Sequence, residues 1–271
     1  MSGWAKADWM SSEPMRDRVV VVTGAGSGIG AGAARVLAAA GARLVLNDLR
    51  EEYLTSLIEE LPGEGHLIVA GDISVESTSE AIVAAATERW GRIDGLVSNV
   101  GLMHFKDIDE VSVEEFDHVM GVNVRGMFLI CKHVIPVMVR QQSGSIVIVT
   151  SPSGYRGQEF DGTSTFVYNM SKAATRQLST SLATRYARDG IRSNALAPGT
   201  IRTKQVRHFL PDMSAEDEDA IFAGATAPIP LGRTGTPEEM GAVILFLLSD
   251  QSSFVTGHTL FADGGHTAKL L

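Results

Sequence analysis

Short apolar runs rich in Val, Ile and Leu alternate along this chain with longer segments in which apolar residues recur at helical spacing. The short runs show no polar alternation, which is typical of strands buried on both faces of a parallel sheet. They predict about seven strands, at residues 19–23, 43–48, 67–70, 95–99, 145–150, 191–197 and 259–262. Strict alternation of strand and helix predicts an α/β fold, namely a single doubly wound domain with parallel strands and helices on both faces.

Two of the intervening helices carry a recognisable start signal. Ser112 with Glu115, and Thr236 with Glu239, have the spacing of a capping box, in which each side chain binds the backbone N–H of the other residue. Pro237 stands at the first helical position of the second helix, where its missing N–H costs nothing. We therefore expect helices to begin after Ser112 and after Thr236.

Composition and charge narrow the possible classes. The 271 residues include 23 Lys and Arg against 32 Asp and Glu, a net charge of −9, which disfavours a nucleic-acid partner. No apolar run reaches membrane-spanning length, and the N-terminus lacks the apolar core of a signal peptide. A lone cysteine, Cys131, excludes an intramolecular disulfide, and the seven histidines lack metal-ligand spacing. We expect a polar tail at 1–16, one domain at 17–271, no metal, no membrane association and a cytoplasmic location.

A glycine-rich turn joins the first strand to the first helix, where residues 23–30 read T-G-A-G-S-G-I-G. Glycines let a backbone turn tightly and approach a pyrophosphate, and a helix N-terminus offers unpaired N–H groups with partial positive charge. The spacing is T-G-x-x-x-G-x-G and differs from the G-x-G-x-x-G fingerprint. A turn without a ligand would have the same composition. We expect dinucleotide phosphates to bind at Gly24, Ser27, Gly28, Ile29 and Gly30.

Asp48 ends the second predicted strand, 18 residues after Gly30. A carboxylate in that place can accept hydrogen bonds from ribose hydroxyls and repels a 2′-phosphate, so it favours NAD over NADP. The one nearby cation, Arg50, weakens this preference, and Asp48 could alternatively cap the next helix.

Tyr168 and Lys172 lie four residues apart in a predicted helix at 166–189 that Gly190 ends. This spacing puts both side chains on one helix face. A tyrosine has an ordinary pKa of about 10, and a fixed ammonium nearby favours the phenolate, so we expect Lys172 to lower the pKa of Tyr168. Such a pair also occurs by chance on helix surfaces and indicates chemistry only in context.

The context is a set of further motifs in a fixed order. Together, the glycine turn, Asp48, Asp72, Asn123, Ser151, Tyr168-x-x-x-Lys172 and Pro198-Gly199 resemble the short-chain dehydrogenase/reductase family, from about residue 17 to 267. The resemblance implies a Rossmann-like fold and a nicotinamide dinucleotide as cofactor.

The same resemblance implies a role for each motif residue. Tyr168 is similar to the family's general acid/base, and Lys172 to the residue that lowers its pKa and holds the nicotinamide ribose. Ser151 resembles the serine that binds the substrate oxygen, with Ser153 as a rival, and Asn123 the helix asparagine of a proton relay. The remaining matches imply cofactor contacts, at Asp72, Ile73, Asn99, Gly101, Asn194, Pro198, Gly199, Ile201 and Thr203. Each also has a purely structural reading as a cap, turn or buried amide.

Two departures from the family pattern stand out. The usual N-N-A-G is Ser98-Asn99-Val100-Gly101 here, which places a bulkier Val100 beside the cofactor. The separation of Ser151 and Tyr168 is 17 residues, where about 13 is usual for the family. We expect the extra residues to form a polar loop at 158–165, at the mouth of the site, that shapes substrate choice.

The resulting hypothesis is an NAD-dependent oxidoreductase that transfers a hydride to or from a secondary alcohol or ketone with an apolar body. An NADPH-dependent carbonyl or 3-oxoacyl reductase is an alternative, and a catalytically idle dinucleotide sensor or scaffold is another. The acidic run 212–219 is expected to be a lid over the substrate. Similarity to the family also implies a homotetramer.

Overall fold

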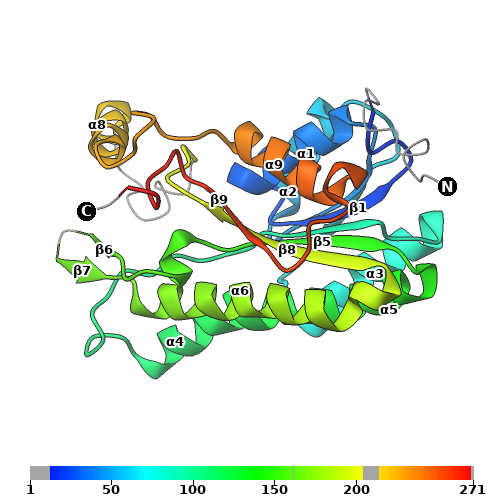
Figure 1. Ribbon diagram of the computed structural model, residues 1–271, viewed down its shortest axis with the longest axis horizontal. Coiled ribbons are helices and arrows are strands. Elements are labelled where there is room, and N and C mark those ends of the chain that lie inside the picture. The colour runs from blue at the N-terminus through cyan, green and yellow to red at the C-terminus, as the bar shows by residue number, and fades with distance from the viewer. Residues whose placement is uncertain (1–12, 161, 204–213, 270–271) are drawn as a thin grey trace.

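The computed structural model describes residues 13–160, 162–203 and 214–269 (Figure 1). Seven strands form one sheet in the order β3-β2-β1-β4-β5-β8-β9, and every neighbouring pair is parallel. The strands are β1 (Val19–Thr23), β2 (Arg43–Asp48), β3 (Leu67–Ala70), β4 (Gly95–Ser98), β5 (Gly144–Val149), β8 (Ile191–Pro198) and β9 (Thr259–Ala262). The predicted doubly wound α/β domain is confirmed, and the strand bounds agree to within one residue.

Helices cover both faces of this sheet (Figure 1). One face carries α1 (Gly28–Ala39), α2 (Glu51–Glu60) and α9 (Pro237–Leu248), and the other carries α3 (Glu76–Trp90), α5 (Met127–Gln141) and α6 (Phe166–Tyr186). The structure also contains the helices α4 (Val113–Met120) and α8 (Ala215–Thr226). α8 lies at the end of the sheet to which the strands point, together with a small hairpin (Figure 1).

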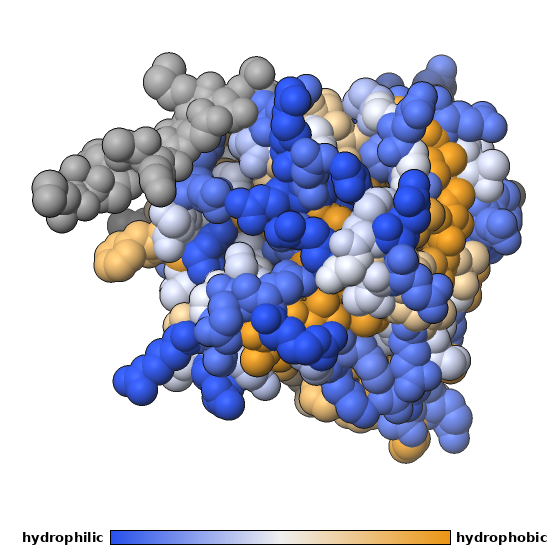
Figure 2. All heavy atoms as spheres, turned by 90° about the vertical axis from the view of Figure 1, so that its right-hand side faces the viewer, coloured by the Kyte–Doolittle hydropathy of each residue, from blue (hydrophilic) through white to orange (hydrophobic). Residues whose placement is uncertain are grey.

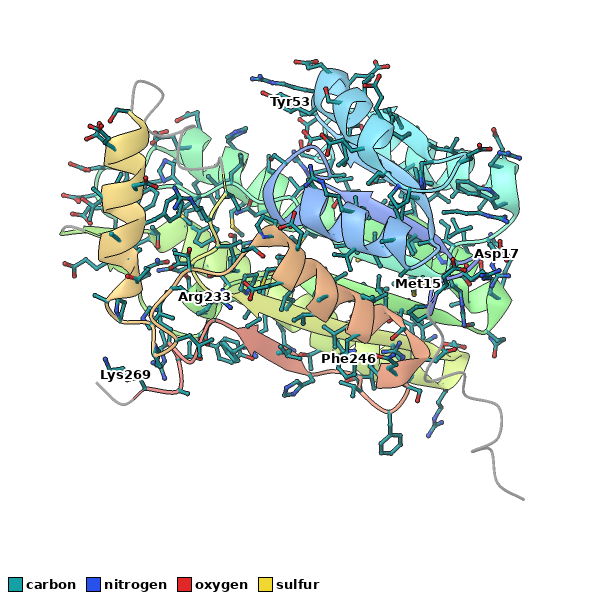
Figure 3. The ribbon with its side chains drawn as sticks, turned by 90° about the horizontal axis from the view of Figure 1, so that it is seen from above. Met15, Asp17, Tyr53, Arg233, Phe246 and Lys269 are labelled. Atoms are coloured by element: carbon teal, nitrogen blue, oxygen red, sulfur yellow. The ribbon has the colours of Figure 1, made fainter. Side chains whose placement is uncertain are left out.

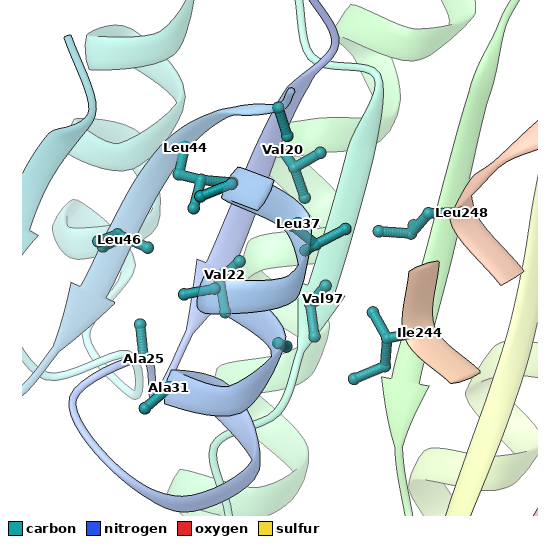
Figure 4. Close-up of a cluster of buried hydrophobic side chains, with 14 of the residues drawn as sticks. Val20, Val22, Ala25, Ala31, Leu37, Leu44, Leu46, Val97, Ile244 and Leu248 are labelled. Carbon is teal, nitrogen blue, oxygen red and sulfur yellow. The ribbon is translucent and has the colours of Figure 1, made fainter. Parts of the chain in front are cut away.

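Alternate residues of the central strands feed two separate cores. Val20 and Val22 of β1 face α1 and α9, where they pack with Leu37 and Ile244 (Figure 4). Val21, between them in sequence, belongs to the opposite core beneath α3 and α5. The period of two along a strand thus explains why the run is apolar throughout, since both of its faces are buried.

Small residues allow α1 and α9 to touch. A Cβ added at Gly32 would lie 2.4 Å from the carbonyl carbon of Pro237, and one added at Gly241 would lie 2.8 Å from the Gly32 oxygen. The capping box of Thr236 and Glu239 is present and begins α9 with Pro237 in its first turn. The second expected box, at the start of α4, is present as well.

The folded domain begins earlier in the chain than residue 17, where the sequence placed its boundary. The side chain of Met15 is 2% exposed within the α1 core, and its backbone N–H donates to the Ala40 oxygen at 3.0 Å. Figure 3 shows Met15 and Asp17 side by side at the end of α1. The surface at this end of the molecule is mostly polar, with apolar residues reaching it in patches (Figure 2).

The segment 158–165, expected as a loop, instead contains a hairpin of β6 (Glu159–Phe160) and β7 (Thr163–Ser164). The base of the hairpin is held by the segment 106–107. The Ser164 N–H donates to Asp107 Oδ1 at 3.3 Å, and Lys106 forms a backbone bridge with Thr165. These partners lie far away in sequence, so local polarity alone suggested an irregular loop.

α4 and α5 are joined without a break by a π-helical turn, Gly121–Gly126. The whole stretch, Val113–Gln141, is long and apolar enough to cross a membrane by length and composition, but 61% of its most apolar window is buried inside the protein. Such burial is what a helix packed in a protein core shows.

Candidate active site

The glycine-rich turn lies where the strand order reverses, at the carboxyl ends of β1 and β4. In open α/β sheets this switch point is where ligands bind. Gly24 and Gly28 have positive φ angles of 65° and 52°, and a Cβ at Gly30 would lie 2.0 Å from the Gly24 oxygen. The N-cap residue Ser27 makes no side-chain cap to α1, so the first-turn N–H groups fit an anionic group such as a pyrophosphate.

Asn99 stabilises the glycine-rich turn through hydrogen bonds. Its side-chain amide donates to the Gly24 oxygen at 3.1 Å, and its backbone N–H donates to Thr23 Oγ1 at 3.1 Å. The side chain is therefore engaged by the protein, which makes Asn99 a support of the turn where a direct cofactor contact was expected. Val100, the departure from the family pattern, packs its side chain against Gly24.

The half-buried Asp48 faces the same turn. Its Oδ2 accepts from the Gly26 N–H at 3.0 Å and its Oδ1 from the Leu49 N–H at 2.8 Å. It does not cap α2, whose N-cap is Arg50. The Arg50 guanidinium donates to the Tyr53 hydroxyl at 2.9 Å and lies 5.5 Å from the centre of that ring. The carboxylate is therefore placed beside the turn, and the neighbouring cation is held by an exposed aromatic ring.

The two residues expected at the adenine differ in accessibility. Asp72 is exposed and closes a local turn by accepting from the Ser74 N–H at 2.8 Å. Ile73 is only 4% exposed and its side chain packs against Gly126. The Ile73 side chain therefore belongs to the core, because the chain turns inward immediately after Asp72, and the expected cofactor contact of this residue stays a prediction.

Ser151 and the paired residues of α6 meet beside this turn. Ser151 lies two residues after the end of β5, and a Cβ at Gly154 would lie 2.8 Å from the backbone of Lys172. The S-x-x-G spacing thus lets the chain after β5 approach α6 closely. Thr150, which the sequence did not single out, reinforces the contact by donating to the Lys172 oxygen at 2.7 Å.

Ser151, Tyr168 and Lys172 are all buried. The Ser151 hydroxyl is near enough to Tyr168 to lower the pKa of its phenol, and the Lys172 ammonium lies 5.5 Å from the centre of the Tyr168 ring. The ammonium donates to the Val149 oxygen at 3.1 Å, and a Cβ at Gly101 would lie 2.9 Å from it. The turn 99–101 therefore joins the glycine turn at one end to Lys172 at the other.

The pKa of Tyr168 is shifted in the direction opposite to that expected from the sequence. Burial raises the pKa of Tyr168, and the neighbouring Ser151 side chain lowers it to a smaller extent. The Lys172 ammonium lies over the Tyr168 ring and donates to the Val149 oxygen, and the effect of burial on the pKa of Tyr168 is the largest one. Burial also lowers the pKa of Lys172, from 10.5 to about 8.

Asn123 sits in the π-helical turn between α4 and α5 and is fully buried. Its side chain accepts from the Leu102 N–H at 2.7 Å and donates to the Leu102 oxygen and to Ser171 Oγ, both at 2.9 Å. Ser171 donates in turn to the Tyr168 backbone oxygen at 2.7 Å. Asn123 thus connects the turn after β4 to the helix that carries Tyr168 and Lys172. Single π turns of this kind are frequent at functional sites.

The segment after β8 returns to the glycine turn. Pro198 ends β8, and a Cβ at Gly199 would lie 2.6 Å from the Cα of Asp263, so a side chain there has no room. Ile201 forms a backbone bridge with Gly235, and Thr203 Cγ2 would lie 3.2 Å from a Cβ at Gly28.

Asn194, in contrast, takes no part in this arrangement. Its side chain donates to the Val255 oxygen at 2.9 Å and accepts from the His258 N–H at 3.1 Å. It therefore fastens β8 to the chain before β9, and the role in seating the nicotinamide that the resemblance implied for Asn194 stays a prediction.

Two features border the site. α8 is linked to the segment after β8 by an ion pair of Arg202 and Asp219, with the Arg202 guanidinium 5.1 Å from the centre of the Phe222 ring. Residues 212–213 of the expected lid lie outside the described residues. Tyr155, in the turn after Ser151, packs against Phe261 with ring centres 5.0 Å apart.

One group of possible metal ligands appears that the sequence spacing had not predicted. Glu76, Glu80 and His133 offer ligand atoms within 4.8 Å of one another on α3 and α5. The Glu76 carboxylate is already bound by the Lys132 ammonium at 2.5 Å, so its charge is compensated within the protein.

Comparisons with known proteins agree with this geometry. A family model described as enoyl-(acyl carrier protein) reductase matches residues 24–267. An uncharacterized oxidoreductase of Thermotoga maritima is 39% identical over 93% of this chain and 98% of its own, and a levodione reductase of Leifsonia aquatica is 38% identical over 93% and 95%.

Solved structures show the same fold. A crystal structure of levodione reductase superposes with a TM-score of 0.87 at 36% identity, covering 94% of this chain and all of the other. A short-chain type dehydrogenase/reductase from Mycobacterium marinum gives a TM-score of 0.86 at 30% identity, with 96% and 100% coverage.

Proposed function

Because this chain belongs to the short-chain dehydrogenase/reductase family of oxidoreductases, we propose that it transfers a hydride between NAD(H) and a secondary alcohol or ketone, with Tyr168 as acid/base. The observation that carries the proposal is the buried contact of Ser151 with Tyr168 beside Lys172, at the sheet edge that holds the glycine turn. An idle sensor or scaffold has no need of a buried hydroxyl pair and a buried ammonium, which are costly to hold.

The cofactor is proposed to lie across the switch point of the sheet. The glycine turn and the N-terminus of α1 would hold its pyrophosphate, Asp48 its adenosine ribose, and Lys172 its second ribose. Thr203 borders the same turn and is proposed to hold the nicotinamide end. When bound, the dinucleotide supplies the hydride acceptor or donor.

The chain's own residues would manage the substrate oxygen. Ser151 and Tyr168 are placed to hold that oxygen between their two hydroxyls. In reduction Tyr168 gives its proton to the oxygen, and in oxidation the phenolate form takes one from the alcohol. Burial raises the pKa of Tyr168, so the protein's own groups favour the phenol, the form needed for reduction. Oxidation should therefore rise with pH more steeply than reduction. Lys172 and Asn123 are proposed to pass the proton onward.

The preference for NAD over NADP rests on Asp48. Its carboxylate is held beside the glycine turn by the Gly26 N–H, where it would repel a 2′-phosphate. An NADPH-dependent carbonyl or 3-oxoacyl reductase remains the second candidate, because the exposed Arg50 is two residues away and would be free to leave the Tyr53 ring.

Binding of both dinucleotides to Asp48→Asn tests this preference. Wild-type protein is expected to bind NADH more tightly than NADPH. The ratio of the Kd for NADPH to the Kd for NADH should fall at least ~10-fold in the variant, since contact between the Asp48 carboxylate and a 2′-phosphate is strongly unfavourable. Asp117→Asn, at an exposed position of α4, is the matched control. Tighter binding of NADPH by the wild type would reject the NAD assignment.

The assembly is proposed to be a homotetramer, supported by large apolar side chains left exposed on α5 and α6. Phe128 and Met170 are each 52% exposed, and Phe166 is 38% exposed. Light scattering after gel filtration would contradict this by giving the mass of a monomer. A cytoplasmic location stays a prediction that cell fractionation tests.

A further inference from the structure

A row of hydrogen-bonded side chains runs from Ser151 to the base of the β6–β7 hairpin. The Ser151 hydroxyl donates to Ser153 Oγ at 3.0 Å, and the Ser153 hydroxyl donates to the side-chain oxygen of Gln158 at 2.5 Å. Both serines are buried. The Gln158 backbone oxygen also accepts from Ser164 Oγ at 3.1 Å, which fixes Gln158 to the second strand of the hairpin.

This row fixes the direction in which the Ser151 hydroxyl donates its proton. A serine hydroxyl has one proton and two acceptor lone pairs. Ser151 gives its proton to Ser153 and accepts from the Ser153 N–H at 3.1 Å. With its proton given to Ser153, Ser151 can only accept from Tyr168, and it can lower the pKa of Tyr168 by donating to it only when this direction is reversed. This direction of donation suits the phenol form of Tyr168. Burial favours the same form, because it raises the pKa of Tyr168. The same direction leaves Ser151 unable to donate to a substrate oxygen.

We propose that Gln158 is a positioning residue that sets the direction in which the Ser151–Ser153 pair donates. This inference deepens the proposed function and rests on it. A glutamine amide carries one acceptor oxygen and two N–H donors, so a half-turn about its last bond exchanges the two ends. With the oxygen toward Ser153, the protons point away from Tyr168. With the NH2 toward Ser153, Ser153 donates to Ser151, and Ser151 donates to the substrate oxygen or the phenolate.

The reaction needs both polarities in turn. Ser151 has to donate to the oxygen on which negative charge develops, and it has to accept again when Tyr168 regains its proton. A residue at 158 that can both accept and donate permits this exchange, without any net transfer of protons along the row. The longer spacing between Ser151 and Tyr168 is what brings Gln158 and the hairpin into this position.

The decisive variants are Gln158→Glu and Gln158→Met. A carboxylate at 158 only accepts, so it locks the protons away from the substrate. Loss of one donor to a developing oxyanion costs 10²–10³ in kcat, and a donor that is turned away but not removed should cost roughly 10- to 100-fold. Met fills similar space but can neither donate nor strongly accept a hydrogen bond, so it leaves the two serine hydroxyls free to turn. The Gln158→Met variant should therefore lose roughly threefold in kcat, well below the loss of Gln158→Glu. The ratio of kcat for Gln158→Glu to that of the wild type should rise as the pH falls from about 8 to about 5, because a protonated carboxyl can donate.

Replacing Ser153, which lies between Gln158 and Ser151, separates an effect carried by the hydrogen bonds from a general structural effect of the substitution. In a Ser153→Ala background, Gln158→Glu is expected to add less than about a twofold change in kcat, since no hydroxyl connects residue 158 to Ser151. Equal losses for Glu and Met, a ratio that does not change with pH, or an undiminished effect in the Ser153→Ala background would each overturn the proposal while leaving the Tyr168 chemistry intact. Absence of turnover by the wild-type protein would instead refute the proposed function, and this inference with it.

Discussion

Replacing Lys172 by Met should make the free protein more stable at neutral pH. Lys172 is 3% exposed, and burial lowers its pKa from 10.5 to about 8. At about 1.4 kcal/mol per pKa unit, holding the charged form in the folded state costs roughly 3 kcal/mol. Met has similar length and no charge, but the substitution forfeits the bond to the Val149 oxygen, worth about 1 kcal/mol. The net expectation is a gain of about 2 kcal/mol in the free energy of unfolding.

The pH dependence of this gain has a definite sign. Between pH 8 and 10.5 the unfolded chain holds a proton on Lys172 that the folded chain has released, so the stability of the wild type rises with pH. Below pH 8 both states are protonated and the full cost remains. The advantage of Lys172→Met should therefore be constant at neutral pH and shrink as the pH rises above 8. The raised pKa of Tyr168 acts in the opposite direction only above its unfolded value of 10.

Urea unfolding without dinucleotide, at one protein concentration and a series of pH values from neutral to about 9.5, measures this difference. Lys269→Met, at an exposed position, is the control and should stay within about 0.5 kcal/mol of the wild type throughout. A Lys172→Met protein that is less stable than the wild type at neutral pH, or a difference that is the same at every pH, would refute the reasoning. Confirmation would show that this site holds its ammonium at the expense of stability.

Three further substitutions test the packing around the site and the capping of α9. Gly101→Ala puts a Cβ 2.9 Å from the Lys172 ammonium and should lower kcat severalfold by displacing it, with the fold retained by circular dichroism; unchanged kinetics would show that the ammonium moves aside freely. Thr236→Ala removes the cap of α9 and should cost about 1 kcal/mol by urea unfolding, and a loss under 0.3 kcal/mol would contradict the capping role. In acid, Glu239→Gln should abolish a stabilisation that the wild type has above pH 4.5 and loses as the pH falls through about 2, because Arg233 and the Thr236 N–H lower the pKa of Glu239.

Local sequence patterns predicted the strands and the starts of two helices well, because burial on both faces and N-terminal capping depend on nearby residues. The apolar runs at 19–23 and 191–197 are strands because both of their faces are buried, and the two boxes at Ser112 and Thr236 begin helices where expected. A third box, at Ser214 with Asp217 in place of Glu, begins α8 and was missed. An aspartate at that position reaches the N-cap N–H less easily, so the signal is weaker.

Contacts between distant segments were not predictable in the same way. The resemblance implies cofactor contacts at Ile73 and Asn99, but it does not show that the Ile73 side chain packs against Gly126 or that the Asn99 amide donates to the Gly24 oxygen. The hairpin at 158–165 depends on Asp107, more than fifty residues earlier. The direction of the Tyr168 pKa shift depends on burial, which i, i+4 spacing does not specify.

The most direct test of the proposed chemistry is Tyr168→Phe. The substitution removes one buried oxygen, so binding of NADH should stay within about threefold of the wild type. Turnover of any secondary alcohol or ketone that the wild type accepts should fall by at least ~10²-fold, the smallest contribution expected of a general acid/base. Tyr155→Phe, where the ring packs on Phe261 and is 47% exposed, should keep its activity. Turnover by Tyr168→Phe within tenfold of the wild type would contradict the assignment of Tyr168 as the acid/base.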